Sequence, residues 1–218
     1  KKTTHAMARK AMTDAKNMGV RYLRVSATGY GPIWYKDQGD LELWFNPATR
    51  AQHWALFDQM MSDMDAQGLK IVPTFVWNWV QFPALAQDTA DNMITNPNSP
   101  SYLLAAEYIT EFINRYKNHP ALYYYELTNE FNLGADLDLK VNCLNEIPPP
   151  WDPNKDRCAP MGRFATDQMI AFTQRLAAHI KSLDPAHPIT SGFSIPRKAA
   201  EHLRACPAWG PEGPACEG

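Results

Sequence analysis

A strand-like segment, residues 119–130, ends in two side chains that can do chemistry. Its letters are HPALYYYELTNE, so an apolar run is followed by the amide of Asn129 and the acid of Glu130. Burial at the end of a strand would raise the pKa of Glu130 toward the value that a general acid needs near neutral pH. The Asn129 amide can both donate and accept, which suits a sugar hydroxyl. On spacing alone, a polar strand end that caps the next turn is an equally good interpretation.

Aromatic side chains gather in the segments that follow the strand-like runs. Trp34 follows the first of them, and Trp77 and Trp79 flank Asn78 after the second. Tyr30, Tyr35, Trp44 and Trp151 occupy similar positions. Flat aromatic faces stack on sugar rings while the hydroxyls stay hydrogen-bonded, so these residues favour a saccharide ligand. We expect others among them to be packing anchors for long loops, and we expect the helical stripes to be core: Trp54, Phe57, Tyr108, Phe112 and Tyr116.

Composition and motifs argue against several other functions. The 21 basic and 23 acidic residues give a net charge of −2, so we expect neither a nucleic-acid surface nor a polybasic membrane patch. The longest apolar run, residues 69–80, is interrupted by Lys70, Pro73 and Asn78 and is shorter than the roughly 20 residues of a membrane helix. The six histidines show no ligand spacing, and no H-E-x-x-H, G-x-S-x-G or Walker A pattern occurs. We therefore expect no metal and no cofactor.

Helical and strand patterns alternate along the chain and would position these side chains. Helices are predicted over residues 5–18, 46–68, 99–118, 163–183 and 197–204, and strands over 20–27, 69–76, 121–128 and 189–193. Long crossovers between short apolar strands indicate parallel pairing and an α/β class. Tight helix-to-strand turns and long strand-to-helix loops favour a (β/α)8 TIM barrel. The alternative is a doubly wound sheet with a G-x-G-x-x-G dinucleotide motif. Gly29-Tyr30-Gly31 matches only the first part of that motif, because the third glycine is missing. With four strands the barrel is partial, and we treat residues 1–218 as one domain.

The segment RYKNHPALYYYELTNEFN, residues 115–132, resembles the fourth-strand motif of the clan A glycoside hydrolases, especially family 5, the cellulase and endo-β-mannanase group. The resemblance implies a retaining endo-β-glycanase that acts on β-linked mannan or glucan. It makes Glu130 the acid/base and Asn129 the ligand of the sugar 2-hydroxyl. Tyr125 departs from the family, which commonly has Trp there. A polysaccharide or oligosaccharide is the implied partner.

Two further segments support the resemblance. YLRVSATGY places Arg24 where the family keeps an arginine on its second strand, although an ordinary buried ion pair with Glu126 is the alternative. KIVPTFVWNW resembles the mannanase-like branch and would place Trp77, Asn78 and Trp79 at the mouth of the site.

In this register the four strands are the family's second to fifth, and its nucleophile, a glutamate on the seventh strand, has no counterpart in the chain. A retaining mechanism needs two carboxylates about 5–5.5 Å apart. Glu126 shares the strand face of Glu130, but four residues separate the two by roughly 13 Å. We therefore expect half an active site. The alternatives are a non-catalytic carbohydrate-binding half-barrel and an inactive structural fragment.

An open parallel sheet leaves strand edges and one apolar face uncovered, so we expect the isolated chain to self-associate or to need the missing half of the barrel. The chain begins Lys1-Lys2 without Met and shows no signal peptide, so either a leader was removed or the chain starts inside a longer protein.

Four cysteines lie in turn-rich segments of the C-terminal part: Cys143, Cys158, Cys206 and Cys216. Local bridges Cys143–Cys158 and Cys206–Cys216 are the simplest of the three pairings and would favour a secreted, extracellular protein. Reduced cysteines in a cytosolic protein are the alternative.

Overall fold

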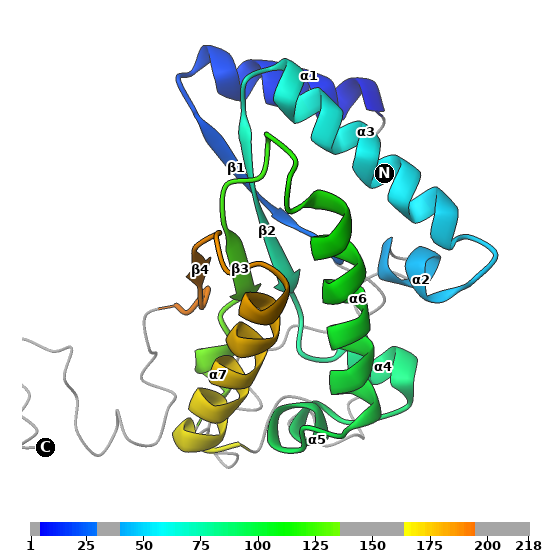
Figure 1. The fold of residues 1–218 in the computed structure, drawn as a ribbon, viewed down its shortest axis with the longest axis vertical. Coiled ribbons are helices and arrows are strands. Elements are labelled where there is room, and N and C mark those ends of the chain that lie inside the picture. Colours follow the sequence, from blue (N-terminus) through cyan, green and yellow to red (C-terminus); the bar gives the residue numbers. More distant parts are fainter. Residues whose placement is uncertain (1–4, 30–39, 136–163, 195–218) are drawn as a thin grey trace, which may run out of the picture.

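The computed structural model describes residues 5–29, 40–135 and 164–194. Within these ranges, four strands form one sheet in chain order: β1 (Tyr22–Ser26), β2 (Lys70–Val76), β3 (Tyr125–Thr128) and β4 (Ile189–Thr190). All three neighbouring pairs are parallel. The arrows of β1, β2 and β3 point toward the same edge of the sheet (Figure 1). The predicted α/β class and the predicted parallel pairing of four strands are confirmed.

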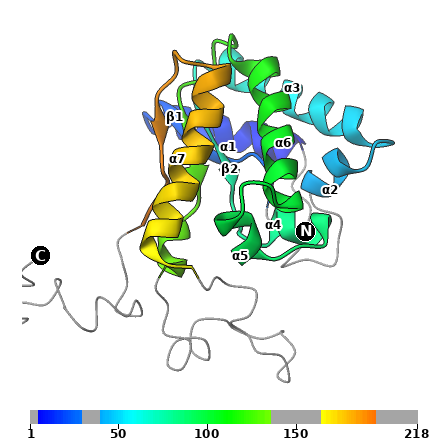
Figure 2. The same ribbon diagram turned by 60° about the horizontal axis from the view of Figure 1, so that its bottom comes forward.

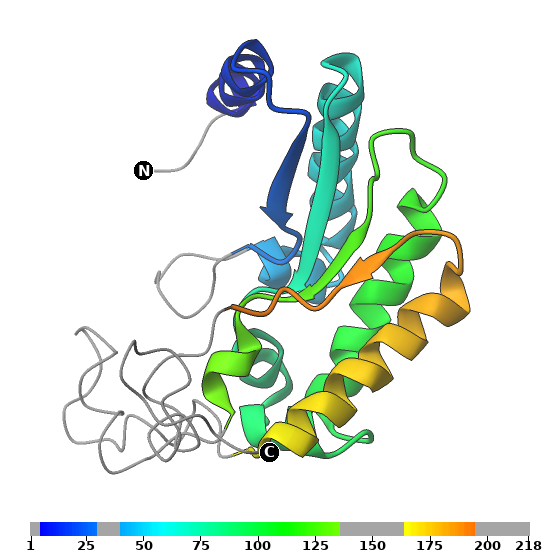
Figure 3. The ribbon, with the colours of Figure 1, turned by 90° about the vertical axis from the view of Figure 1, so that its left-hand side faces the viewer.

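Helices separate the strands along the chain. They are α1 (His5–Asn17), α2 (Asp40–Phe45), α3 (Arg50–Ala66), α4 (Gln81–Ala86), α5 (Ala90–Thr95), α6 (Pro100–Tyr116), α7 (Thr166–Leu183) and the 3₁₀ helix η1 (Phe131–Gly134). The long helices α3, α6 and α7 lie on the same side of the sheet (Figure 3). The short helices α4 and α5 pack beside α6 (Figure 2). Such a one-sided helical layer on a parallel sheet is the arrangement of a barrel segment.

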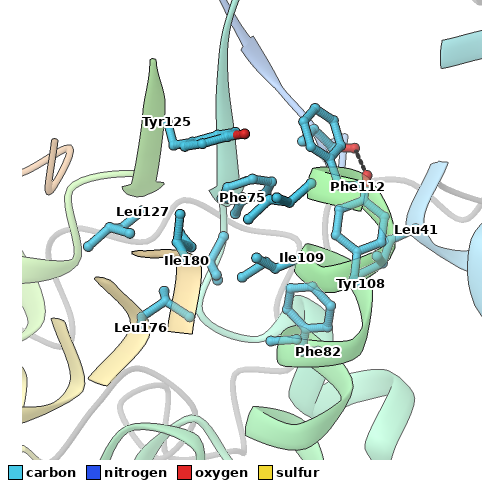
Figure 4. Close-up of a cluster of buried hydrophobic side chains, with 14 of the residues drawn as sticks. Leu41, Phe75, Phe82, Tyr108, Ile109, Phe112, Tyr125, Leu127, Leu176 and Ile180 are labelled. Carbon is cyan, nitrogen blue, oxygen red and sulfur yellow. Dashed lines mark hydrogen bonds between the residues drawn. The ribbon is translucent and has the colours of Figure 1, made fainter. Parts of the chain in front are cut away.

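The core lies between the sheet and this helical layer. Alternate strand residues point to opposite faces, and one set, which includes Phe75, Tyr125 and Leu127, is buried against α6 and α7 (Figure 4). The predicted aromatic stripes are also buried: Trp54, Phe57, Tyr108, Phe112 and Tyr116. Phe75 and Phe112 meet edge to face at 5.1 Å between ring centroids. The helical periodicity therefore identified the core face of α3 and α6 correctly.

The opposite face of the sheet carries a row of polar side chains. The strand register aligns Ser26, Thr74, Glu126 and Thr190 in one row across all four strands. In a closed barrel the face away from the helices is the interior, which is filled by side chains. A polar row at this level brings charged and hydroxyl groups of successive strands together beneath the carboxyl edge of the sheet.

Some predicted boundaries are wrong. The helix expected to open at Asn46-Pro47 begins at Arg50, because the Asn46 side chain accepts the Ala48 N–H (3.0 Å) and forms a turn between α2 and α3. The strand expected over 189–193 ends at Thr190, because Gly192 takes a left-handed φ of 73°. The helix expected over 197–204 and all four cysteines lie outside the described residues.

Candidate active site

The candidate site lies at the carboxyl edge of the sheet. Trp77 follows the end of β2, and Asn129 and Glu130 follow the end of β3. Because the strands are parallel, these residues emerge at one edge, where barrel enzymes carry their active sites. Trp77, Asn129 and Glu130 are half-buried.

Arg24 of β1 and Thr74 of β2 both bond to Glu126 of β3. Its Nε donates to Glu126 Oε1 (2.6 Å), its Nη2 also contacts that oxygen, and Nη2 donates to Asn129 Oδ1 (2.9 Å). Thr74 of β2 adds a third group by donating Oγ1 to the same Glu126 oxygen (2.6 Å). Charge-assisted bonds of this kind are stronger than neutral ones. The ion pair with Glu126, which the sequence offered as the alternative to a site role for Arg24, is therefore present, and the same guanidinium also contacts the Asn129 amide.

The Arg24 guanidinium also lies over the ring of Trp77. Its Cζ is 4.6 Å from the ring centroid, a cation–π geometry. Arg24 thus contacts residues that follow two different strands, Trp77 after β2 and Asn129 after β3. These contacts bring three residues predicted from the sequence into one cluster.

Glu130 has a strained backbone. Its φ of 56° and ψ of 28° are left-handed, and among the described residues Gln87 is the other non-glycine with positive φ. Left-handed backbone costs an L-residue roughly 1–2 kcal/mol, and such residues cluster at functional sites. The Glu130 N–H donates to the Gly192 carbonyl (2.9 Å), which fixes the acid to the segment after β4.

Gly192 has to be glycine at this point. A Cβ built on it would lie 1.8 Å from the Thr128 carbonyl oxygen and 2.8 Å from Glu126 Cγ. Its φ of 73° is also unfavourable for other residues. The sequence reasoning did not include Gly192 in the site, because the close approach depends on the pairing of β3 with β4.

A buried glutamine ties together the segments that follow β1 and β2. Gln81 Oε1 accepts from Thr28 Oγ1 (3.0 Å) and from the Asn78 N–H (3.1 Å), and its Nε2 donates to the Gly29 carbonyl (2.8 Å). Both Thr28 and Gln81 are fully buried. The position of Asn78, a predicted substrate ligand, therefore depends on Gln81, which the sequence reasoning missed. The sequence feature that could have indicated this role is that Gln81 is a polar residue at the start of the apolar run QFPAL.

Trp79, a predicted substrate ligand, packs against other aromatic side chains of the protein. Its ring stacks on Phe131 at 5.4 Å and 18°, and Phe164 lies 5.8 Å away. Trp44 is fully buried and donates Nε1 to Glu111 (2.9 Å), so it is a packing anchor. Trp34, a predicted substrate ligand, lies outside the described residues, as do Tyr30, Tyr35 and Trp151.

The phenol of Tyr124 adds no charge near the Arg24–Glu126 pair. Burial raises the pKa of Tyr124, and nearby Tyr22 and Glu126 raise it further, whereas Arg24 lowers it. The net increase keeps the phenol neutral at physiological pH. The charges at this level of the sheet are then those of Arg24 and Glu126.

A separate open pocket of about 660 Å³ lies between α3 and α6, lined by Arg50, Trp54, Glu111 and Arg115 among others. Its arginines are already paired, Arg50 with Glu111 (3.0 Å) and Arg115 with Asp58. We therefore place the site at the sheet edge and not in this pocket.

In the part of the chain that the structure describes, no group of three or more His, Cys, Asp or Glu could bind a metal ion. None of its helices combines the length and the apolar character of a membrane span.

Comparison with known proteins identifies what this chain resembles. It is 27% identical over 149 residues to the probable mannan endo-1,4-beta-mannosidase C of Aspergillus terreus, which covers 64% of this chain and 32% of that protein. It is 26% identical over 141 residues to the mannan endo-1,4-beta-mannosidase F of Aspergillus clavatus, covering 62% and 26%. The chain resembles part of a glycoside hydrolase family 5 endo-β-mannanase. It spans about a third or less of the length of these curated relatives. No protein-family model matches it.

Solved mannanase structures share the fold. The endo-β-1,4-mannanase of Thermotoga petrophila superposes with a TM-score of 0.58 at 17% identity, covering 88% of this chain and 40% of that enzyme. The endo-1,4-β-mannanase of Rhizomucor miehei gives a TM-score of 0.57 at 17% identity, covering 88% and 53%. A family 5 glycoside hydrolase of Bacteroides vulgatus gives 0.51 at 15% identity, covering 87% and 32%. The predicted partial TIM barrel and the predicted resemblance are confirmed.

Proposed function

We propose that this mannanase-like chain provides the acid/base part of a retaining endo-β-mannanase, with Glu130 as the acid/base and Asn129 as the ligand of a sugar hydroxyl. The observation that carries the proposal is the Asn129–Glu130 pair at the carboxyl edge of β3, with the Asn129 amide bonded to Arg24. The strained backbone of Glu130 supports a functional role for this residue. The names of the fungal relatives favour β-linked mannan over glucan as substrate.

In the proposed mechanism Glu130 acts twice. Its carboxyl proton passes to the glycosidic oxygen as the bond to the anomeric carbon breaks, and a second carboxylate forms the glycosyl-enzyme. The Glu130 carboxylate then takes a proton from the water that attacks the anomeric carbon, which releases the second carboxylate and restores the acid. We assign the second carboxylate to no residue of this chain. Asn129 contributes a hydrogen bond to the sugar 2-hydroxyl, a contact that strengthens in the transition state.

A second candidate is a carbohydrate-binding half-barrel without catalysis. Glu126 is the other carboxylate on the polar face of the four described strands, and its Oε1 already accepts from Arg24 and Thr74. It is therefore not available as a nucleophile. If no other carboxylate approaches Glu130, the site can bind sugar but cannot form a glycosyl-enzyme.

The decisive experiment compares wild-type and Glu130→Gln full-length protein on mannan and on carboxymethylcellulose. We expect faster hydrolysis of mannan and a loss of about 10²–10⁴-fold on substitution, the contribution of a general acid. Glu107→Gln, on the exposed surface of α6, is the matched control and should keep full activity. Full activity of Glu130→Gln would remove Glu130 from the mechanism. Calorimetry with manno-oligosaccharides that shows tight binding without turnover would support the second candidate.

A further inference from the structure

We propose that Glu126 is a positioning residue that sets the orientation of the Asn129 side-chain amide, with its oxygen bound to Arg24 and its NH₂ group presented to the sugar. This inference rests on the proposed function of Asn129 and Glu130. It goes further by assigning a role to a carboxylate that does not itself touch the substrate.

The first step is the fixing of Arg24 by Glu126. Glu126 is only 8% exposed, and its Oε1 accepts from Arg24 Nε (2.6 Å), from Arg24 Nη2 and from Thr74 Oγ1 (2.6 Å). A buried carboxylate that lost these donors would be left uncompensated, at a high cost in free energy. The pair therefore strongly favours one position of the guanidinium, although the Arg24 side chain itself is 38% exposed.

The second step is the fixing of Asn129 by Arg24. Arg24 Nη2 lies 2.9 Å from the Asn129 side chain. An arginine has donors and no acceptor, so the amide atom that faces it must be the oxygen. The NH₂ group then points to the other side, and it makes no hydrogen bond with any residue in the described ranges. Asn129 is thus set to donate to a ligand hydroxyl.

The third observation links the same carboxylate to the acid. The space beside Glu126 Cγ and Cδ is occupied by Gly192, where an added Cβ would lie 2.8 and 2.9 Å from these atoms. The Gly192 carbonyl accepts the Glu130 N–H (2.9 Å). Glu126 therefore lies between the two groups that the proposed function uses, contacting Asn129 through Arg24 and Glu130 through Gly192.

The chemical consequence can be tested by removing the charge at nearly constant shape. In Glu126→Gln the side chain no longer holds Arg24 as an ion-pair partner, so Arg24 can move and the Asn129 amide can rotate. Asp184→Asn is the matched control, because Asp184 is also a buried carboxylate (5% exposed) but bonds to Tyr125 and His187. None of these hydrogen-bond partners contacts Arg24 or the Asn129 side chain in the described ranges.

The first experiment reads the amide directly, without requiring activity. In ¹⁵N-labelled full chain, the Asn129 side-chain NH₂ signals are identified by their loss in Asn129→Ala. We expect these signals to shift and broaden in Glu126→Gln and to stay in place in Asp184→Asn. If Glu126→Gln does not fold, Thr74→Val, which removes one donor to the same oxygen, should produce a smaller shift of the same signals. Unmoved Asn129 signals in a folded Glu126→Gln protein, or in Thr74→Val if that variant is the one that folds, would overturn the proposal.

The second experiment is a double-mutant cycle on mannan hydrolysis by the full-length protein. We expect Glu126→Gln to lower kcat by about 10–100-fold, since misplacing a group by about 1 Å can cost 10²-fold, with KM changed less than about threefold. In an Asn129→Ala background the same substitution should have little further effect, because the residue it acts through is gone. Additive losses would show a general structural role and contradict the proposal. If the wild-type protein hydrolyses no mannan, the proposed function fails, and the NMR experiment still decides the role of Glu126.

Discussion

At the scale of the residue, Glu130 combines a functional side chain with an unfavourable backbone. Its left-handed φ of 56° is stabilised by the hydrogen bond from its N–H to Gly192, in a turn that joins β3 to η1. Glycine adopts this conformation without steric cost, whereas glutamate and alanine do not. A glutamate at this position therefore lowers the stability of the fold relative to what glycine would give.

Two variants that both remove the carboxyl group separate the backbone strain from the side chain. We expect Glu130→Gly to be more stable than Glu130→Ala by about 1 kcal/mol, because only glycine relieves the left-handed strain. Both variants should lack the proposed hydrolytic activity. Urea unfolding measures the difference in the free energy of unfolding.

The control pair is Glu107→Gly and Glu107→Ala in the middle of α6, where Glu107 is exposed. There the order should reverse, with alanine more stable by about 1 kcal/mol, because glycine disfavours a helix. A Glu130→Gly protein that is less stable than Glu130→Ala would contradict the strained conformation.

The sequence identified some of these residues and not others, because only some of them are marked by a local pattern. Asn129 and Glu130 follow an apolar strand directly, and Arg24 interrupts another, so local pattern and resemblance identify them. Glu126 entered as an alternative partner of Arg24 and as a second carboxylate too far from Glu130, but no local pattern indicated that it is linked to Asn129 through Arg24. Gly192 depends on a contact between segments far apart in the chain, which no local pattern contains.

At the scale of the element, the turn from α7 into β4 is anchored by Asp184. Its Oδ2 accepts from Tyr125 OH (2.8 Å) and lies 2.6 Å from His187 Nδ1, and its Oδ1 accepts the Ala186 N–H (3.0 Å). Tyr125, the position that departs from the family resemblance, thus provides a phenolic donor. These bonds connect the end of α7 to β3.

The Asp184 anchor predicts a pH dependence of stability. Burial raises the pKa of Asp184, but hydrogen bonds from Tyr125, His187 and backbone N–H groups lower it by more, so the net pKa lies below its usual value. The folded state therefore binds the proton less tightly than the unfolded state does. The stabilisation is present above the unfolded pKa of about 3.9 and is lost as the pH falls through the folded value.

We expect the stability difference between wild-type and Asp184→Asn protein to be largest above about pH 5 and to shrink below about pH 4. Urea unfolding of both proteins across this range measures it. A difference that stays constant down to pH 3 would show that the carboxylate charge does not contribute.

The length of an element decided whether its sequence pattern was sufficient. The long helices α3, α6 and α7 span 17 or 18 residues, so several turns of apolar spacing were visible. The helices α2, α4 and α5 have six residues each, less than two full turns, so the helical period does not repeat in them, and they were missed. Ser99 and Pro100 marked the start of α6 correctly, because the Ser99 side chain accepts the Tyr102 N–H (3.2 Å).

At the scale of the whole molecule, the described sheet is covered on one side only. In the described ranges β1 pairs with β2 alone and β4 with β3 alone, so two strand edges are unpaired. The face away from the helices carries Tyr22, which is 48% exposed, and the polar row that includes Glu126. The sequence predicted this architecture from the asymmetry of its loops, but it led us to expect an apolar open face, and that face carries Arg24, Thr74 and Glu126 beside Val72.

Unpaired edges still favour association, because their N–H and C=O groups can pair with another chain. We expect the isolated chain, of 24.7 kDa, to show a mass above that of the monomer in size-exclusion chromatography with light scattering at tens of micromolar, roughly the range where exposed edges aggregate. A single monomeric peak under these conditions would contradict the prediction. Co-expression with the remainder of a barrel, if it restores a monomeric complex, would identify the edges as the cause.

The reach of Arg24 from β1 across β2 to β3 restricts how the chain can change in length. Since successive side chains alternate between faces, a one-residue insertion in the turn between α1 and β1 that shifts the pairing of β1 by one residue would direct the arginine toward the helices. Insertions or deletions in homologous genes should therefore be rare in the short turns that enter the strands. They should be far more frequent in the segments that leave the strands, where new substrate preferences could arise without disturbing the sheet.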